Sequence, residues 1–280
     1  MKKQTTMLAK RAASAVAIIL FGVLLVFAGG WIFTIGVALI LSTAAWEYTN
    51  MFRKGGYSPA SYIVIAGTFI TALASRFVNP EFLLLAVSFF VLAVIVWHIL
   101  TFASHQETAG IDLAASLSAV VFIAFLGSFI IRLRFLPDGF QPDGLYWLLM
   151  AIAPAGISDI GAFLIGSAIG SHKMAPALSP GKTIEGYLGG VLTAAVTGYA
   201  VGAIANLSIP HISGLTGLMI GSVVGVFCPL GDLGKSLLKR QFNLKSTSNL
   251  IPGHGGVLDR IDTWLWASAI SYYLIRAFFM

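Results

Sequence analysis

The sequence predicts an all-α integral membrane protein with about nine transmembrane helices and a polar site on the cytoplasmic side. Hydrophobic residues make up 58% of the 280 residues and charged residues only 10%. A soluble domain carries about 25% charged residues. Too little polar surface is present to cover a water-soluble protein of this size, so much of the surface must contact lipid.

Apolar segments long enough to cross a bilayer follow one another along nearly the whole chain. A helix needs about 20 apolar residues to span the hydrocarbon core. The predicted spans are 12–28, 30–48, 61–78, 81–101, 113–134, 145–169, 184–206, 212–230 and 261–279. The first begins after basic residues, as a signal peptide does, but a second apolar stretch follows at once and favours a membrane helix. The weakest divisions are the break at Gly29 and Gly30 and the segment 145–169, which carries a charge and several glycines.

The basic residues agree with these spans if the N-terminus is cytoplasmic. The cytoplasmic segments then hold thirteen of the 17 Lys and Arg residues: Lys2, Lys3, Lys10, Arg11, Arg53, Lys54, Lys173, Lys182, Lys235, Lys239, Arg240, Lys245 and Arg260. The opposite side holds Arg76, Arg132, Arg134 and Arg276. This bias follows the positive-inside rule and predicts that the polar stretches face the cytoplasm.

No segment is large enough to fold as a separate soluble domain. We therefore expect one integral membrane domain over 1–280, with N-terminal helices at about 12–134 and the polar motifs within about 145–280. The single cysteine, Cys228, excludes an intrachain disulfide. The net charge of +6 fits basic loops beside anionic lipid, and no basic module that would bind nucleic acid is present.

Two polar features occur in the middle of the chain, one within a predicted span and one beside it. Asp159 lies in an otherwise apolar span, where an ionisable side chain indicates function, with helix capping as the alternative. Residues 171–186 contain a "GKT" sequence, but Pro176 replaces the first glycine of a Walker A loop and no strand precedes it. Thr183 is placed to cap the next helix, whose N-terminus favours an anion. A basic loop that only follows the topology rule is the alternative.

The third polar region has two parts, residues 231–241 and residues 253–262. On helices, each part places its polar residues on one face: Asp232, Ser236 and Lys239 in the first, Asp259 and Asp262 in the second. Mg²⁺ is typically bound by carboxylates together with substrate phosphates, and Lys and Arg contact further phosphate oxygens. The pattern indicates phosphate chemistry at the membrane surface, with simple salt bridges as the alternative.

These residues resemble the signature of the phosphatidate cytidylyltransferases, or CDP-diacylglycerol synthases, which reads S-x-x-K-R-x4-K-D, a gap, then P-x-H-G-G-x-x-D-R-x-D. The matching residues here are Ser236, Lys239, Arg240, Lys245, Pro252, His254, Gly255, Gly256, Asp259, Arg260 and Asp262. The stretches 230–233 and 179–186, Asp159 and the "WEY" at 46–48 are similar as well. The resemblance spans nearly the whole chain.

The resemblance implies transfer of a cytidylyl group from CTP to phosphatidic acid, giving CDP-diacylglycerol and pyrophosphate, in a bacterial cytoplasmic membrane. It implies Mg²⁺, with room for a second cation, bound by Asp232 and Asp259. The implied catalytic residues are Asp232, Lys239, Arg240, Asp259, Asp262 and His254. The implied substrate-binding residues are Asp159, Ser179, Lys182, Thr183, Glu185, Ser236, Lys245, Asn249 and Arg260. Membrane lipids and a second copy of the chain, but no nucleic acid, are the other expected partners.

Three positions depart from the family pattern. The family usually has an acid at Lys235, an aspartate at Ser246 and an arginine at Ser167. Fewer carboxylates would weaken a metal site, unless Lys235 now contacts phosphate. A catalytically weakened homologue that binds phospholipid or nucleotide is therefore one alternative.

Two further alternatives stay open. One is a cytidylyltransferase for another lipid phosphate. The other is a transporter, against which the lack of internal repeats argues.

Two pairs of glycines are spaced four residues apart, Gly166 with Gly170 and Gly198 with Gly202. Such spacing lets helices approach closely. The contacts are either within one chain or between the two copies of a homodimer.

Overall fold

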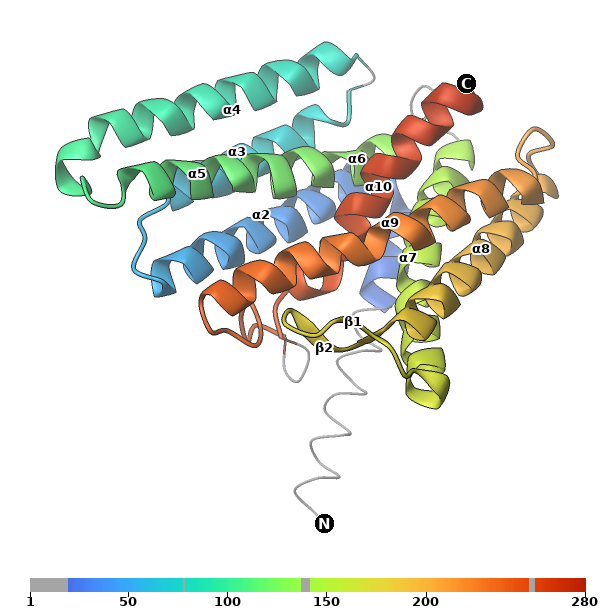
Figure 1. The fold of residues 1–280 in the computed structure, drawn as a ribbon. Coiled ribbons are helices and arrows are strands. Elements are labelled where there is room, and N and C mark those ends of the chain that lie inside the picture. Colours follow the sequence, from blue (N-terminus) through green and yellow to red (C-terminus); the bar gives the residue numbers. More distant parts are fainter. Residues whose placement is uncertain (1–19, 78, 137–141, 252–254) are drawn as a thin grey trace, which may run out of the picture. The chain divides into compact units, whose positions relative to one another are not determined.

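The structure is a computed structural model that describes residues 20–77, 79–136, 142–251 and 255–280 (Figure 1). The chain divides into two compact units, which are described separately. The N-terminal unit comprises Met1–Ile131 and Gln241–Ile261, and the C-terminal unit comprises Arg132–Arg240 and Asp262–Met280. The single membrane domain expected over 1–280 stays a prediction.

The N-terminal unit consists of helices packed side by side. Residues 20–28 are helical, and the elements that follow are α2 (Gly30–Lys54), α3 (Ser61–Ala74), α4 (Pro80–Leu100), the short 3₁₀ turn η1 (Phe102–Ser104), α5 (Ala109–Ala119), the π-helical η2 (Val120–Phe125) and α6 (Leu126–Arg134), whose last residues belong to the C-terminal unit. α2 packs on α3, and α3 packs on α4 (Figure 1). Gly29 and Gly30 have φ angles of 59° and 54°, which few other residues tolerate. The predicted helix break at these glycines is confirmed.

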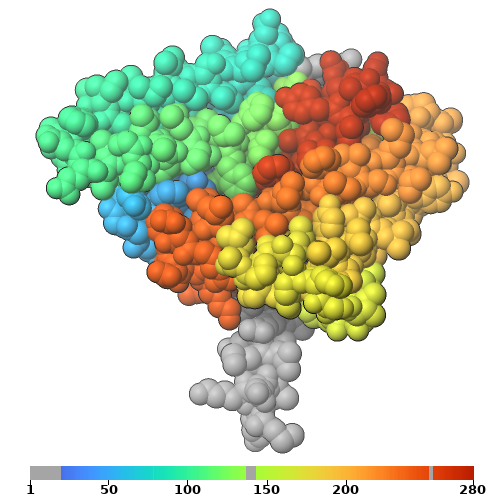
Figure 2. Space-filling view, in the orientation of Figure 1, coloured from blue at the N-terminus to red at the C-terminus, as the bar shows by residue number. Residues whose placement is uncertain are grey.

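The C-terminal unit combines long helices with one small hairpin. Its elements are α7 (Pro142–Ile169), β1 (Lys173–Ala175), β2 (Ser179–Thr183), α8 (Ile184–Asn206), α9 (Gly214–Gln241) and α10 (Leu258–Phe278), whose first residues belong to the N-terminal unit. The strands pair antiparallel, with Lys173 opposite Thr183, and Figure 2 shows the hairpin (yellow) at the surface of this unit.

The hairpin lies between the predicted spans 145–169 and 184–206, where the sequence predicted no strand. The Leu178 N–H donates to the Ala175 carbonyl at 3.2 Å and closes a tight turn. Pro176 is the second residue of this turn, where its fixed φ is favoured. The turn chemistry therefore brings the two short strands together.

The glycine pairs of the C-terminal unit serve contacts within the chain. Gly198 and Gly202 of α8 lie against the backbone of Gly217 on α9, where an added Cβ would collide. Gly166 of α7 and Gly170, which follows the end of that helix, lie against the Thr183 side chain. Of the two alternatives for these spacings, the structure supports the intrachain one.

Within the described residues, six helices are long and apolar enough to cross a membrane: Gly30–Lys54, Pro80–Leu100, Ala109–Arg134, Asp143–Ile169, Ile184–Asn206 and Gly214–Gln241. Large apolar side chains remain exposed on them, among them Leu84, Leu85 and Phe89 of α4. Water would not tolerate so much exposed apolar surface, whereas lipid does. The chain is a multi-pass membrane protein.

The remaining predicted spans differ from their expected bounds. The helix expected at 61–78 ends at Ala74 and has 14 residues, and residue 78 lies outside the described residues. The last helix has 21 residues but carries charges at both ends and is not among the six. The first 8 residues of the predicted span 12–28 lie outside the described residues. α9 continues to Gln241, past the predicted end at 230, so the polar stretch of 232–240 is helical.

Candidate active site

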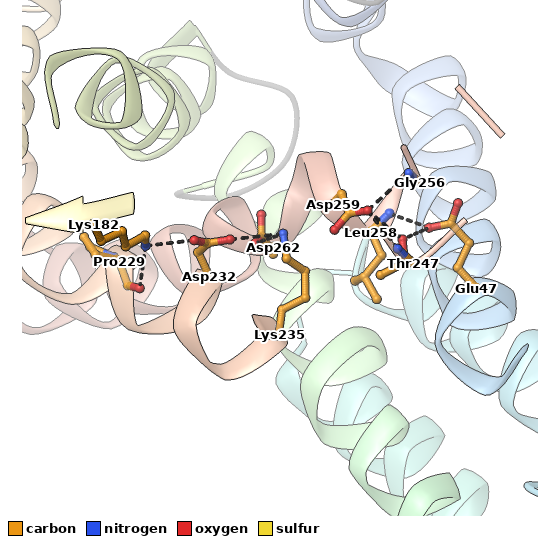
Figure 3. Close-up of polar contacts among 10 residues, drawn as sticks. All are labelled: Glu47, Lys182, Pro229, Asp232, Lys235, Thr247, Gly256, Leu258, Asp259 and Asp262. Atoms are coloured by element: carbon orange, nitrogen blue, oxygen red, sulfur yellow. Dashed lines mark hydrogen bonds and ion pairs between the residues drawn. The ribbon is translucent and has the colours of Figure 1, made fainter. Parts of the chain in front are cut away.

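Four side chains of alternating charge form a row in the C-terminal unit (Figure 3). The Lys182 ammonium at the end of β2 lies 2.8 Å from Oδ2 of Asp232 on α9. The Lys235 ammonium lies 3.2 Å from Oδ1 of the same aspartate and also pairs with Oδ2 of Asp262 on α10. Asp232 thus has an ammonium group at each of its two oxygens.

The row runs from a partly accessible end to a buried end. The side chains of Lys182 and Asp232 are 26% and 28% exposed. Lys235 and Asp262 are each 3% exposed. Buried charges are tolerated only when they are paired, and two ammonium groups here balance two carboxylates. At the accessible end, Lys182 and Asp232 can therefore form new contacts with a ligand. At the buried end, Lys235 and Asp262 keep their mutual contact and fix the position of the row.

Local sequence explains part of this row. Asp232 and Lys235 are three residues apart and so lie on the same face of α9. Pro229 lies inside the same helix, where it removes one backbone hydrogen bond. Its carbonyl oxygen lies 3.5 Å from the Lys182 ammonium, which binds the hairpin to α9 at this point.

A cavity of about 470 Å³ lies in the same unit and includes Lys182 in its wall. Volumes of about 300–1,000 Å³ are usual for small-molecule sites. Its polar lining comes from α7, the hairpin and α8: Ser158, Asp159, Ser167, Lys173, Ser179, Lys182, Thr183 and Tyr187. Asp159 lies in its apolar span as predicted, and its side chain is exposed at this wall. A cavity allows a membrane helix to carry a carboxylate without burying it.

Thr183 caps α8, as the sequence predicts. Its hydroxyl accepts a hydrogen bond from the Gly186 N–H at 3.1 Å. Glu185, in the first turn of α8, contacts His172 just before the hairpin. Its carboxylate lies 2.6 Å from Nδ1 of His172 and also accepts from the His172 backbone N–H at 3.2 Å. Glu185 thus stabilises the hairpin and is not part of the cavity lining.

A second carboxylate cluster lies in the N-terminal unit, around Glu47 of α2 (Figure 3). Glu47 is fully buried. Its Oε1 accepts from the Ser248 hydroxyl at 2.6 Å and the Val257 N–H at 2.8 Å. Its Oε2 accepts from the Leu258 N–H at 2.8 Å and lies 3.1 Å from the Thr247 hydroxyl. All four donors are neutral.

Asp259 belongs to the same cluster. Its Oδ2 accepts from the backbone N–H groups of Thr247 at 2.9 Å and Gly256 at 3.3 Å. Glu47 accepts from the Val257 and Leu258 N–H groups at the start of α10, where negative charge is favoured. Glu47 therefore caps this helix from α2, and Asp259 holds the loop that precedes it.

The geometry of this cluster requires glycine at Gly255 and Gly256. Gly255 has a φ of 82°, which favours glycine. A Cβ on Gly256 would collide with the Thr247 hydroxyl and the Glu47 carboxylate. His254 lies outside the described residues.

The predicted site residues fall into the two units. The C-terminal unit contains Asp159, Ser179, Lys182, Thr183, Glu185, Asp232, Ser236, Lys239, Arg240 and Asp262, and the N-terminal unit contains Lys245, Asn249, Asp259 and Arg260. In the former, Lys182, Asp232 and Asp262 share the charged row. The Arg240 Nε donates to the Leu178 carbonyl at 3.2 Å, and Ser236 is buried. In the latter, Lys245, Asn249 and Arg260 are exposed.

Two important side chains were not among the predicted site residues. Glu47 is an acid within the apolar span predicted at 30–48, and the criterion that singled out Asp159 would have found it. Lys235 was noted only as a departure from a family pattern. Its partner on α10 is distant in sequence, so no local pattern predicts the bridge.

Mg²⁺ is expected at Asp232 and Asp259, which lie in different units of the chain. Among the described residues, no three His, Cys, Asp or Glu side chains gather where they could hold a metal ion. Both oxygens of Asp232 face ammonium groups, and Oδ2 of Asp259 accepts from neutral donors. A divalent ion would need phosphate oxygens from a substrate to complete its coordination. The metal-binding role of these two aspartates stays a prediction.

Comparison with known proteins gives one consistent result. The sequence model of the cytidylyltransferase family matches residues 9–278. A phosphatidate cytidylyltransferase of Synechocystis sp. is 32% identical, over 95% of this chain and 96% of that protein. Phosphatidate cytidylyltransferases of Bacillus subtilis and Haemophilus influenzae are 36% and 39% identical, over 57% and 54% of this chain and 57% and 52% of those proteins.

Proposed function

Because the chain belongs to the cytidylyltransferase family, we propose that it transfers the cytidylyl group of CTP to phosphatidic acid in phospholipid synthesis. The observation that carries this proposal is the charged row beside the cavity of the C-terminal unit. A phosphate oxygen of phosphatidic acid bonds to the α-phosphorus of CTP. The bond from that phosphorus to the bridging oxygen breaks, which yields CDP-diacylglycerol and pyrophosphate.

The chemistry requires cations more than it requires a base. The attacking phosphate oxygen is already an anion, so no side chain needs to remove a proton from it. Negative charge gathers on the phosphoryl oxygens as the bond to pyrophosphate breaks, and positioned cations stabilise that charge. Lys182 and Lys173 line the cavity and are placed to contact those oxygens. Asp232 orients the Lys182 ammonium through their 2.8 Å contact.

Mg²⁺ enters this proposal as part of the substrate. Nucleoside triphosphates bind Mg²⁺ through their phosphates, and protein sites typically add one or two carboxylates. Asp232, at the accessible end of the row, is the carboxylate of the C-terminal unit best placed to add such a contact when Lys182 moves onto phosphate. The α8 N-terminus, capped by Thr183, further favours an anion in the cavity.

We place the site on the cytoplasmic face of a bacterial cytoplasmic membrane. The distribution of basic residues supports this orientation. A homodimer is proposed from the family resemblance alone, since the glycine pairs serve intrachain contacts.

The direct test supplies purified protein in detergent with labelled CTP, phosphatidic acid and Mg²⁺. Labelled CDP-diacylglycerol, absent after chelation of Mg²⁺, is the expected product. Bound CTP without product would point instead to a catalytically weakened homologue. Neither CTP binding nor product would contradict the proposal.

A further inference from the structure

We propose that the Lys235 ammonium is the resident cation of the charged row, so that the protein binds a divalent ion only together with substrate phosphates. The claim that a divalent ion binds together with nucleotide phosphates rests on the proposed function. The claim that the protein alone binds such an ion weakly is independent of it.

The position of the ammonium supports this role. Lys235 lies between two carboxylates, 3.2 Å from Oδ1 of Asp232 and in direct contact with Oδ2 of Asp262. Lys235 and Asp262 are each 3% exposed, so water does little to screen them. Two carboxylates in such a place repel each other unless a cation lies between them. Here a side chain of the protein supplies that cation.

The charges of the four side chains in the row balance one another. Lys182 and Lys235 contribute two positive charges, which equal the two negative charges of Asp232 and Asp262. A divalent ion would add two uncompensated charges beside an ammonium group. The phosphates of a nucleotide would offset them, because a triphosphate brings several negative charges.

The two lysines differ in how readily they can be displaced. Lys182 is 26% exposed and lines the cavity, so its ammonium can move onto a phosphate. Lys235 is enclosed, and moving it away would take the cation from the buried Asp262 carboxylate and from Oδ1 of Asp232. Incoming phosphate or metal therefore reaches the row at Asp232, and the charge of Lys235 stays in place.

A substitution converts this arrangement into a metal site. Lys235→Glu removes the ammonium and adds a third carboxylate beside Asp232 and Asp262, and hard cations prefer such oxygen ligands. Lys54→Glu makes the same charge change at an exposed position on α2 and serves as the control.

The test titrates Mn²⁺ into each full-length protein in detergent, without nucleotide or lipid, and follows binding by electron paramagnetic resonance. Wild type and Lys54→Glu should bind Mn²⁺ weakly, and their melting temperatures should not respond to the ion. Lys235→Glu should bind at least about tenfold more tightly and should melt at a higher temperature with Mn²⁺ than with chelator.

Equally tight Mn²⁺ binding by wild type and Lys235→Glu would overturn the proposal. If Lys235→Glu does not fold, Lys235→Met replaces it, with the same expected direction because the ammonium is gone. Tight binding by wild type alone would also overturn the proposal, whichever variant folds. Neither result depends on cytidylyl transfer, so the two proposals can fail independently.

Discussion

Carboxylates are treated in opposite ways in the two units of this chain. In the C-terminal unit, Asp232 and Asp262 meet the ammonium groups of Lys182 and Lys235. In the N-terminal unit, the donors to Glu47 among the described residues are backbone N–H groups and hydroxyls. The partners of Asp232 and Asp262 are therefore charged, whereas the donors to Glu47 are neutral.

The difference separates a structural role from a chemical one. Neutral donors have fixed positions and hold the Glu47 carboxylate and the start of α10 in one geometry. An ammonium on a flexible lysine can leave its carboxylate for a phosphate of similar charge. We therefore expect substitutions around Glu47 to affect stability and substitutions at Lys182 to affect catalysis.

The largest expected effect is on stability. Glu47→Gln replaces one acceptor oxygen with an NH₂ group that faces buried N–H and O–H donors. We expect a loss of about 3 kcal/mol of stability, measured by denaturation in detergent. Glu107→Gln, on an exposed residue, is the control. Unchanged stability would show that Glu47 does not hold the loop to α2.

The next effect is on catalysis. Lys182→Met removes the ammonium that lines the cavity, and we expect kcat/KM for CTP to fall about 100-fold. The melting temperature should change little because the side chain is partly exposed. Lys54→Met, which changes an exposed lysine, should keep full activity. If Lys182→Met lowered stability but kept full activity, the catalytic role assigned to Lys182 would be contradicted.

Gly256→Ala sharpens the structural side of the comparison. The added methyl group would collide with the Thr247 hydroxyl and the Glu47 carboxylate, so we expect a loss of about 2 kcal/mol in thermal denaturation. Gly234→Ala adds the same methyl group where no atom lies within 4 Å, and should cost nothing. Equal effects of the two substitutions would argue against close packing at Gly256.

The smallest effect concerns the cap of α8. Thr183→Ala removes the hydroxyl that accepts from the Gly186 N–H and should cost about 1 kcal/mol. Thr183→Ser keeps the hydroxyl and should retain most of that stability in the same thermal melt. A serine variant as unstable as the alanine variant would assign the effect to lost packing.

The sequence predicted what local patterns encode. Apolar runs predicted the membrane helices, paired glycines predicted the break before α2, and Thr183 was identified as a cap. The hairpin was missed because its strands are too short to show alternation. The partners of Glu47 and the bridge from Lys235 to Asp262 join residues far apart in the chain, which no spacing rule reaches.

The central claim is that the charged row performs the transfer and the Glu47 cluster only supports the fold. The most direct test is turnover per folded molecule of Asp232→Asn and Glu47→Gln, assayed at a temperature where both are folded. We predict that Asp232→Asn loses turnover and keeps its melting temperature, while Glu47→Gln keeps turnover and melts lower. Full turnover by Asp232→Asn, or its loss in folded Glu47→Gln, would contradict the account.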